Sequence, residues 1–296
     1  MEQKIMTLLA RTPVHVGAGN SVGAVDAPVM RERHTRIPII PGTSLKGVLS
    51  ARWCDKCNMK RVEKRDKMVW QRIEGSDAEW LFGQETDREA RAGALLVGEA
   101  RVLAFPVRSA KNGFAWLTCP LVLNRFKRDA GAGFTVPRPD SDDHCFAAES
   151  VVIGGRVILE EYCYTVSGQV DDALAGELKD LSDDAVWSDL ASHLVVVTDG
   201  IFSHFVEQAC EVVTRVRIDD DTGTVAEGAL FNQEQVPSET LFYAAIDAQQ
   251  EKTSGEKRRS ATEALETLKT KLDADPVLQV GGDETTGLGF CSTKLI

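Results

Sequence analysis

The sequence predicts an α+β fold, with helices packed on one face of a mainly antiparallel sheet. Apolar runs typical of strands alternate with helical patterns, but without the regular strand–helix rhythm of a doubly wound parallel sheet. Residues 211–231 alternate apolar and polar side chains on both sides of the turn sequence DDDTG, which predicts a β-hairpin. The faces of this hairpin are weakly apolar, so we expect it to project from the body of the protein.

The first third of the chain predicts a strand, a long loop and a helix. The strand is expected over 4–16, and a loop with glycines and prolines follows it. A helix is expected to begin after Pro41, with Thr43 or Ser44 capping its first turn. The strongly basic segment 56–72 predicts a solvated helix or a mobile stretch. A capping-box pattern from Ser76 to Glu79 marks another helix start.

The remaining elements follow from hydrophobic period and from glycine and proline positions. Strands are expected over 93–107, 155–168 and 239–248, helices over 120–130, 171–193 and 260–274, a strand followed by a helix over 194–209, and strand, glycine-rich loop and strand over 277–296. Within 171–193 and just after it, the candidate buried positions are Leu174, Leu178, Leu181, Trp187, Leu190 and Leu194. This order is best matched by a ferredoxin-like βαββαβ core with long insertions.

The composition excludes several classes of protein. The 296 residues are 43% hydrophobic and 27% charged, which is ordinary for a globular chain in water. The sequence has no apolar run long enough to span a bilayer and no signal-peptide pattern at its start, so a cytoplasmic protein without a membrane partner is expected. Seven dispersed cysteines fit reduced thiols better than a disulfide framework.

Charge is distributed unevenly along the chain. The formal net charge is −11, which by itself argues against nucleic-acid binding. Residues 1–72, however, hold 14 Lys and Arg against 6 Asp and Glu, a net of +8, and the remainder therefore carries −19. This asymmetry predicts one basic working face and one acidic region that is solvated or meets a basic partner.

Several residues could carry chemistry, and each has a structural alternative. Asp26 could bind a metal or accept a proton, or it could be a turn acid that bonds nearby amides. His15 could contact a phosphate, or be a satisfied histidine at a strand end. Lys46 lies in the first turn of its helix, where anions are favoured, or simply faces solvent. Cys54 and Cys57 form a CxxC pair without an evident second pair of zinc ligands.

Other motifs are weaker. The glycine-rich sequence GGDETTGLG permits close backbone approach to a phosphate, but matches neither a Walker A loop nor a Rossmann fingerprint, and a plain hairpin loop explains it. Arg31, Arg33 and Arg36 form a charge run that could hold RNA or be solvated.

Long segments of the chain, taken together, resemble one family. The loop HVGAGNSVGAVDAPVMRERHTRIPIIPGTSLKGVLSARW resembles the start of the repeated backbone subunit of the Cmr (type III-B) CRISPR RNA-targeting complex, which belongs to the RAMP group of RNA-binding proteins. EARVLAFPVRS, FAWLTCPLVLNRF, TRVRIDDDTGTVAEGALFNQEQVPSETLFY and VGGDETTGLGF match in order and span most of the chain.

The resemblance implies a fold and a set of partners. It implies a single RAMP domain over 1–296, with a ferredoxin-like (RRM-like) palm and a projecting thumb hairpin over 212–231. It also implies that copies of the chain assemble as a helical filament along a CRISPR guide RNA, together with other Cmr subunits, and cleave complementary target RNA at regular intervals.

The resemblance also assigns residues. Asp26 matches the aspartate needed for target cleavage, where we expect it to hold a divalent metal, Mg²⁺ above others, while His15 and Glu227 match positions near the cut. Thr43, Ser44 and Lys46 match the turn that grips the guide backbone. RNA contacts are further expected from Arg31, Arg52, Arg215, Arg217, Gly282, Gly287 and Gly289. Two alternatives remain: a non-catalytic guide-binding scaffold, and a metal-independent endoribonuclease that processes CRISPR precursor RNA.

Overall fold

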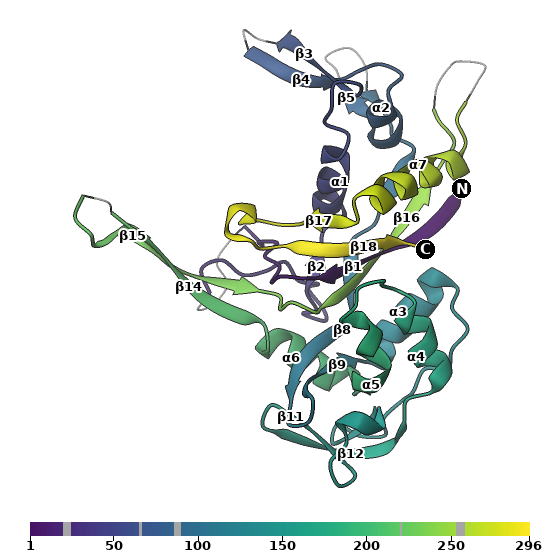
Figure 1. Cartoon of the computed structure of the whole chain (residues 1–296), viewed down its shortest axis with the longest axis vertical. Helices are drawn as coiled ribbons and strands as arrows, with labels where there is room; N and C mark the ends of the chain where they lie inside the picture. The colour runs from purple at the N-terminus through teal and green to yellow at the C-terminus, as the bar shows by residue number, and fades with distance from the viewer. Residues whose placement is uncertain (20–24, 65–66, 86–89, 220, 253–257) are drawn as a thin grey trace.

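The protein, seen here in a computed structural model, is described over residues 1–296 except for 20–24, 65–66, 86–89, 220 and 253–257. A mixed α/β architecture surrounds one large sheet (Figure 1). The strands of this sheet are β1 (Glu2–Ala10), β2 (Ile39–Ile40), β7 (Leu95–Val97), β8 (Ala100–Ser109), β9 (Gly113–Thr118), β10 (His144–Ala147), β11 (Arg156–Leu159), β12 (Tyr162–Gln169), β13 (Leu194–Val196), β16 (Leu241–Ala248), β17 (Val277–Gln279) and β18 (Phe290–Leu295).

The strand order confirms the predicted mainly antiparallel sheet. Neighbouring strands run β11-β12-β10-β13-β9-β8-β16-β1-β18-β17, while β2 pairs with β8 and β7 pairs with β16. In the centre of the sheet, β8, β16, β1 and β18 are antiparallel to their neighbours. Parallel pairing joins β10 to β12 and β13 to β9, at the end of the sheet formed by residues 100–196.

The helices are short and lie between strands. They are α1 (Gly42–Ala51), α2 (Asp77–Phe82), α3 (Pro120–Ala130), α4 (Asp172–Lys179), α5 (Leu190–His193), α6 (Asp199–Gln208) and α7 (Ala261–Ala274), with 3₁₀ turns η1 (Glu149–Val151), η2 (Trp187–Asp189) and η3 (Glu284–Thr286). The predicted helices α3 and α7 are confirmed. Pro120 lies in the first turn of α3, and a complete capping box of Ser260 and Glu263 begins α7.

The segment expected as one acidic helix is divided. Residues 171–193 fold as α4, η2 and α5, each with its own turn, yet all the leucines and the tryptophan expected to be buried are buried. The hydrophobic positions were therefore predicted correctly, although the continuous helix was not.

Helix α1 begins earlier than expected. Pro41 occupies the N-cap position, so Thr43 and Ser44 lie inside the first turn and the prediction that one of them caps the helix was wrong. A side chain at Gly42 would overlap the carbonyl oxygen of Val97. Close packing of the helix start on β7 therefore decides where α1 begins.

Two further expectations for the N-terminal half were wrong. The first strand ends at Ala10, and within the rest of the expected strand the ladder is reduced to a single bridge, between Val14 and Val236. The strand expected over 93–107 is interrupted at Gly98, where an added side chain would meet the carbonyl oxygen of Ala245. Of the capping box expected at α2, the half from the Ser76 hydroxyl is present, accepting a hydrogen bond from the amide of Glu79.

The basic segment 56–72 is neither helical nor irregular, contrary to prediction. It forms the hairpin of β3 (Met59–Lys64) and β4 (Lys67–Arg72), with Val62 opposite Val69. The flanking charged residues are exposed, so no buried helical stripe was available to favour a helix. A smaller pair, β5 (Gln84–Glu85) and β6 (Ala90–Arg91), lies nearby in the chain.

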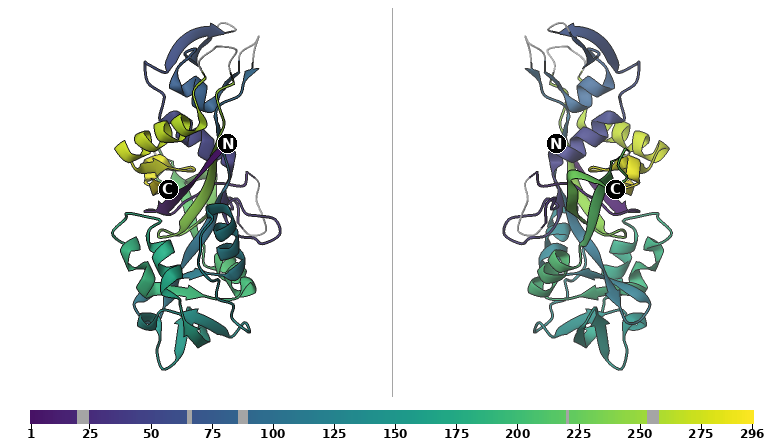
Figure 2. Two further views of the ribbon diagram at one scale, coloured as in Figure 1. Left: turned by 90° about the vertical axis from the view of Figure 1, so that its right-hand side faces the viewer. Right: turned by 90° about the vertical axis from the view of Figure 1, so that its left-hand side faces the viewer.

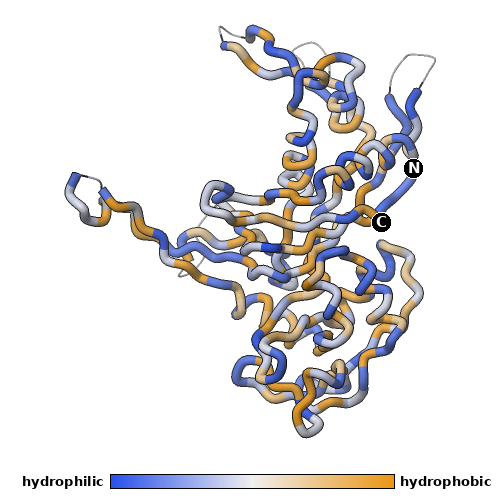
Figure 3. Tube along the Cα trace, viewed as in Figure 1, coloured by the Kyte–Doolittle hydropathy of each residue, from blue (hydrophilic) through white to orange (hydrophobic). Residues whose placement is uncertain are grey.

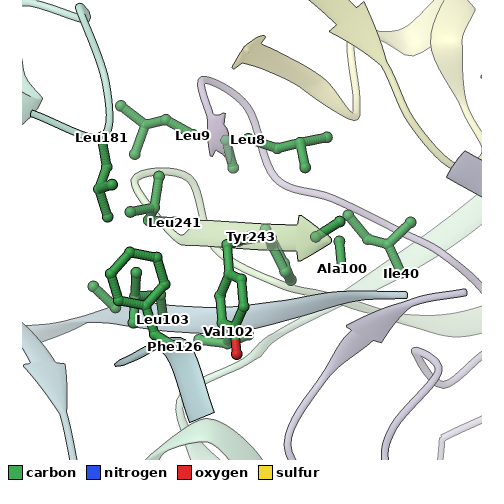
Figure 4. Packing of buried hydrophobic residues seen from close by; sticks show 14 of the residues in the cluster. Leu8, Leu9, Ile40, Ala100, Val102, Leu103, Phe126, Leu181, Leu241 and Tyr243 are labelled. Atoms are coloured by element: carbon green, nitrogen blue, oxygen red, sulfur yellow. The ribbon is translucent and has the colours of Figure 1, made fainter. Parts of the chain in front are cut away.

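Both faces of the central sheet are covered. Ile5 to Ala10 of β1 are all buried, although successive side chains of a strand point to opposite faces. Figure 4 shows the packing around Leu9, Leu241 and Tyr243, where α3 contributes Phe126 in edge-to-face contact with the Tyr243 ring. The expectation that helices cover one face was therefore too simple, because the other face is buried as well.

The predicted hairpin of 211–231 is confirmed as β14 (Glu211–Ile218) and β15 (Val225–Gln235), and it is longer than expected. It projects from the body at the left of Figure 1, and Figure 3 shows hydrophobic and hydrophilic residues interspersed along it. Val212, Val216, Ile218 and Leu230 are exposed on it. No helix within the described residues is long and apolar enough to cross a membrane.

Candidate nucleic-acid interface

The base of the projecting hairpin brings distant loops together. One edge of β15 pairs with β14, with Thr214 opposite Asn232. Along its other edge, Val236 bridges Val14 and Gln233 bridges Ala27. The loops that carry His15 and Asp26 therefore meet the same edge, at bridges three strand positions apart, or roughly 10 Å.

Asp26 is exposed but held in place. Its Oδ2 accepts a hydrogen bond from the backbone amide of Asn232 at 2.9 Å. The neighbouring Ala27 exchanges backbone hydrogen bonds with Asn232 and Glu234. As a turn acid Asp26 would bond within its own loop; instead it anchors that loop to a strand more than 200 residues away. Its other carboxylate oxygen has no hydrogen-bond partner in the described part of the chain.

His15 is buried beside the same strand. Its Nδ1 lies 2.7 Å from the carbonyl oxygen of Glu234, and 8% of the residue is exposed. Because a carbonyl oxygen only accepts, Nδ1 must donate, which leaves Nε2 as an acceptor when the ring is neutral. The carbonyl of His15 in turn accepts the amide of Gly282 at 2.9 Å. His15 thus links the hairpin base to the glycine-rich loop.

Arg31 ties the Asp26 loop to the body. Its guanidinium donates to Glu234 Oε1 at 2.5 Å and to the carbonyl of Val206 at 2.9 Å, and its side chain is 4% exposed. Burial alone would lower the pKa of Arg31, but Cys210 and Glu234 outweigh it and the pKa is raised. Burial raises the pKa of the Cys210 thiol to about 12, so Glu234 supplies the counter-charge at neutral pH.

This burial corrects the prediction that Arg31 contacts RNA. The donors of its guanidinium are used within the chain, and Glu234 Oε2 also accepts the amide of Val29 at 2.9 Å. Arg31 is neither solvated nor free for RNA: it braces the Asp26 loop against its own chain. Arg33, by contrast, is exposed.

The glycine-rich loop packs on the segment that carries His15. Gly281 has φ +91°, and a side chain there would overlap the carbonyl oxygen of His15. Asp283 accepts a hydrogen bond from the buried side chain of Gln233 at 2.5 Å. Gln233 also accepts one from Arg215 Nε at 2.9 Å, so hairpin, loop and strand share one polar network. Two residues predicted to contact RNA lie here. Arg215 is part of this network, and Gly282 lies next to Asp283, which is also part of it.

The other two glycines of the prediction differ in their surroundings. A side chain at Gly289 would overlap the carbonyl oxygen of Val280, whereas nothing lies within 4 Å of the corresponding position at Gly287. Gly289 is therefore required by packing within the chain, and Gly287 leaves its face of the loop open to a ligand.

Helix α1 presents Thr43, Ser44 and Lys46 beyond this network. Thr43 is exposed and the other two are half-buried. Burial, followed by repulsion from Arg72, lowers the pKa of Lys46. Lys46 makes no ion pair with a described residue, so its charge remains uncompensated there.

Arg52, also predicted to bind RNA, is used within the chain. Its guanidinium donates to the carboxylate of Asp275 and to the carbonyl oxygen of Val277. It therefore joins the end of α1 to β17, and the prediction of an RNA contact does not fit this arrangement. The side chains of Arg217 and Glu227 lie outside the described residues.

Clustered metal ligands are absent from the described part of the chain: no group of three or more His, Cys, Asp or Glu could hold an ion. Cys54 and Cys57 are exposed and unbridged. A divalent ion such as Mg²⁺ usually takes one or two carboxylates and completes its shell with phosphate oxygens and waters. The exposed Asp26 fits that pattern as one protein ligand beside an RNA phosphate.

Sequence reasoning missed the residues that organise this interface. Asn232, Gln233 and Glu234 hold Asp26, the glycine-rich loop and Arg31 respectively. Each contact joins residues far apart in the chain, so no spacing pattern could have indicated it. The one available signal was the polar run NQEQ at the end of an otherwise apolar strand.

Comparison with known proteins agrees with this architecture. A model of the RAMP superfamily matches residues 7–292. The CRISPR system Cmr endoribonuclease Cmr4 of Pyrococcus furiosus is 37% identical over 304 residues, covering 100% of this chain and 96% of that protein. The crystal structure of oligomeric Cmr4 from Pyrococcus furiosus superposes with a TM-score of 0.71 at 28% identity, covering 100% of this chain and 98% of that one.

A more distant structure shows the same fold. A chain of the type III-B Cmr-beta complex bound to cognate target RNA, determined by cryo-EM, matches with a TM-score of 0.72 at 19% identity, covering 100% of this chain and 97% of that one. The resemblance seen in the sequence is therefore confirmed along the full length of the chain. This chain belongs to the RAMP superfamily and, within it, to the Cmr4 family.

Proposed function

We propose that this chain is the endoribonuclease subunit of a cytoplasmic, RNA-guided Cmr complex, which binds CRISPR guide RNA and cleaves complementary RNA at regular intervals. Copies of it would form a helical filament along the guide, in contact with other Cmr subunits. One observation carries the proposal: an exposed carboxylate, Asp26, is fixed to the base of a projecting hairpin. A relative at 37% identity bears the name of a CRISPR endoribonuclease.

The topology supports a ferredoxin-like palm with a thumb, within a single RAMP domain. The elements β1, α1, β8, β16, α7 and β18 occur in the order βαββαβ, and their strands lie in the sheet as β8-β16-β1-β18. This is the arrangement of a split βαβ fold. The other strands are insertions, and β14–β15 is the proposed thumb.

The proposed cleavage uses the 2′-OH of the target RNA as nucleophile. The exposed Val212, Val216 and Leu230 of the hairpin would enter the guide–target duplex and displace a nucleotide from its stack. That displacement would bring the 2′-oxygen into line with the neighbouring phosphate. Asp26 lies where the hairpin joins the body. A target RNA strand bent by the hairpin would therefore pass close to the Asp26 carboxylate.

Asp26 is the proposed metal ligand, and the other assigned residues position the RNA. A divalent ion, Mg²⁺ above others, would supply positive charge against the negative charge that develops at the phosphate. Asp26 contributes the carboxylate that holds it, since an ordinary aspartate is a weak base at neutral pH. His15, kept in one tautomer by Glu234, orients the glycine-rich loop, and Lys46 pairs with the guide backbone. Glu227 remains a second proposed residue near the cut.

The test is reconstitution of the complex with guide RNA, a matching target and Mg²⁺. Asp26→Asn keeps an oxygen to accept the Asn232 amide, so the loop should stay anchored while the charge is lost. We expect regularly spaced cuts to slow by roughly 100-fold or more, with guide binding unchanged. Asp140→Asn, at an exposed aspartate of another loop, is the matched control. Cleavage by the Asp26 variant at the wild-type rate would refute the proposal.

A further inference from the structure

The hairpin β3–β4 has one face that carries two arginines and an exposed tryptophan, together with Met59, Met68 and Glu63. Its register places Arg61 opposite Trp70 and Met59 opposite Arg72. Directly opposed residues of an antiparallel pair lie on the same face, as do residues two apart along a strand. Arg72, Trp70 and Arg61 therefore share one face, with Arg72 nearest the base of the hairpin.

Trp70 is unusual among the tryptophans of this chain. It is 60% exposed, whereas Trp53, Trp80, Trp116 and Trp187 are at most 5% exposed. The Arg61 guanidinium lies 5.2 Å from the centroid of the Trp70 ring, in a cation–π contact that covers one side of the indole. The remaining exposed ring is a platform of the kind on which a nucleic-acid base stacks.

At the base of the hairpin, two cations lie together without a carboxylate. Arg72 is held against the body: it donates to the hydroxyl of Ser50 on α1 at 2.7 Å and to the carbonyl oxygen of Gly83, and lies over the Phe82 ring. Lys46 lies one helical turn before Ser50 on the same helix face. Burial lowers the pKa of both Lys46 and Arg72, and for Lys46 repulsion from Arg72 adds to it. Among the described residues no acid pairs with either, so an anion bound there would relieve their repulsion.

We propose that the β3–β4 hairpin and Lys46 form a binding surface for single-stranded RNA, with a phosphate at Lys46, beside Arg72, and a base stacked on Trp70. Charge favours RNA over a protein as the occupant. The register places Arg61, Arg72 and the acid Glu63 on the face of Trp70, and Lys60 and Lys67 on the opposite face, so cations outnumber acids among the described residues of the hairpin as a whole. RNA offers phosphates to pair with the cations and bases to stack on the indole, whereas an apolar protein patch would contact only the indole ring.

The surface extends the guide-binding face of the proposed function. In Figure 1 α1 leads upward into β3–β4, and both views of Figure 2 keep this hairpin at one end of the molecule, apart from β14–β15. The inference therefore rests on the proposed function for the identity of the RNA. The residues of this surface are not among those assigned to cleavage. Binding of RNA here and cleavage at Asp26 can be tested separately.

The experiment is a titration of the purified full chain with single-stranded oligouridylate, followed by tryptophan fluorescence. Stacking on Trp70 should quench the emission of the one exposed indole, and Trp70→Leu should abolish that quenching. Because stacking contributes about 1–3 kcal/mol per base, affinity should fall roughly 5- to 150-fold. Trp70→Phe, which keeps an aromatic face, should retain most of the affinity.

The charge component has its own matched pair. Lys46→Gln should reduce the slope of log affinity against log salt by about 0.7, because the proposal places a phosphate at Lys46. Arg108→Gln, at an arginine 81% exposed on β8, should leave the slope unchanged. RNA affinity unaltered by Trp70→Leu would overturn the proposal. A Trp70→Leu variant that changes oligomeric state, with unaltered RNA affinity, would instead make this face a protein contact. None of these results depends on whether Asp26→Asn abolishes cleavage.

Discussion

At the scale of single residues, arginines of equal charge have different uses in this chain. Arg31 is buried and saturated by Glu234 and the Val206 carbonyl. Arg52 joins α1 to β17, and Arg61 lies exposed over an indole. What separates these uses is whether the fold places a carboxylate or carbonyl oxygen within reach of the guanidinium, because desolvated arginine requires such partners.

Arg31→Met tests the structural use of the buried pair. Removing one partner leaves the charge of Glu234 buried and unpaired, which costs about 3–5 kcal/mol in such cases. Urea unfolding should show a loss of that order, while the exposed Arg33→Met control should change the unfolding free energy by less than about 0.5 kcal/mol. Unaltered stability of the Arg31 variant, together with lost RNA binding, would return Arg31 to the set of RNA contacts.

At the scale of elements, the glycine-rich loop depends on two different properties of glycine. Gly281 and Gly287 both have positive φ, +91° and +86°. At Gly281 a side chain would also overlap the backbone of His15, whereas the space at Gly287 is open. Close approach to the His15 segment is therefore specific to one of these glycines, and that approach holds the loop beside Asp26.

Alanine substitutions separate these two properties. Gly287→Ala should cost about 1–2 kcal/mol through the left-handed backbone conformation alone. Gly281→Ala should cost more, since the loop must also move away from His15 and lose the Gly282 amide bond. Thermal unfolding of the two variants gives the comparison. Equal losses of stability would mean that the loop does not rest on His15 in solution.

At the scale of the whole molecule, the basic part of the sequence is divided between ion pairs and exposed side chains: Arg31, Arg36 and Arg52 pair with Glu234, Glu207 and Asp275. Residues 1–72, with net charge +8, supply β1, the Asp26 loop, α1 and the β3–β4 hairpin, while the rest of the chain carries −19. A basic face along the guide and acidic surfaces elsewhere are compatible with a filament subunit, because only one face needs to attract phosphate. The negative net charge of the chain is therefore no obstacle to RNA binding.

Chelation distinguishes the proposed function from precursor processing. In the reconstituted complex, EDTA should stop target cleavage and leave guide binding intact. The Asp26 carboxylate is itself negative, so it can offset the negative charge that develops at a phosphate only through the cation that it holds. Addition of excess Mg²⁺ should restore the cuts. If the purified chain alone cut repeat RNA in EDTA, the metal-independent alternative would replace the one proposed here.

Much of the fold could be predicted because it depends on local patterns. The period-two alternation around DDDTG predicted the β14–β15 hairpin, Pro120 predicted the start of α3, and the amphipathic pattern of 260–274 predicted α7. The β3–β4 hairpin was missed because charged and polar residues make up most of its two strands, MKRVEK and KMVWQR, so they show no regular apolar alternation. The start of α1 was missed because packing of Gly42 on β7 overrides the preference of Thr43 and Ser44 for cap positions.

The sequence by itself determined the family, the strand and helix content, and the identity of Asp26 as the candidate carboxylate, because these depend on residue type and order. Only the tertiary structure decided what the carboxylate and the arginines face. The edge of β15 collects loops from both ends of the chain, and its Asn232 and Glu234 separate the exposed Asp26 from the buried Arg31, five residues apart. Partners near or beyond 200 residues away leave no periodic trace in the sequence, since they are set by strand register and packing.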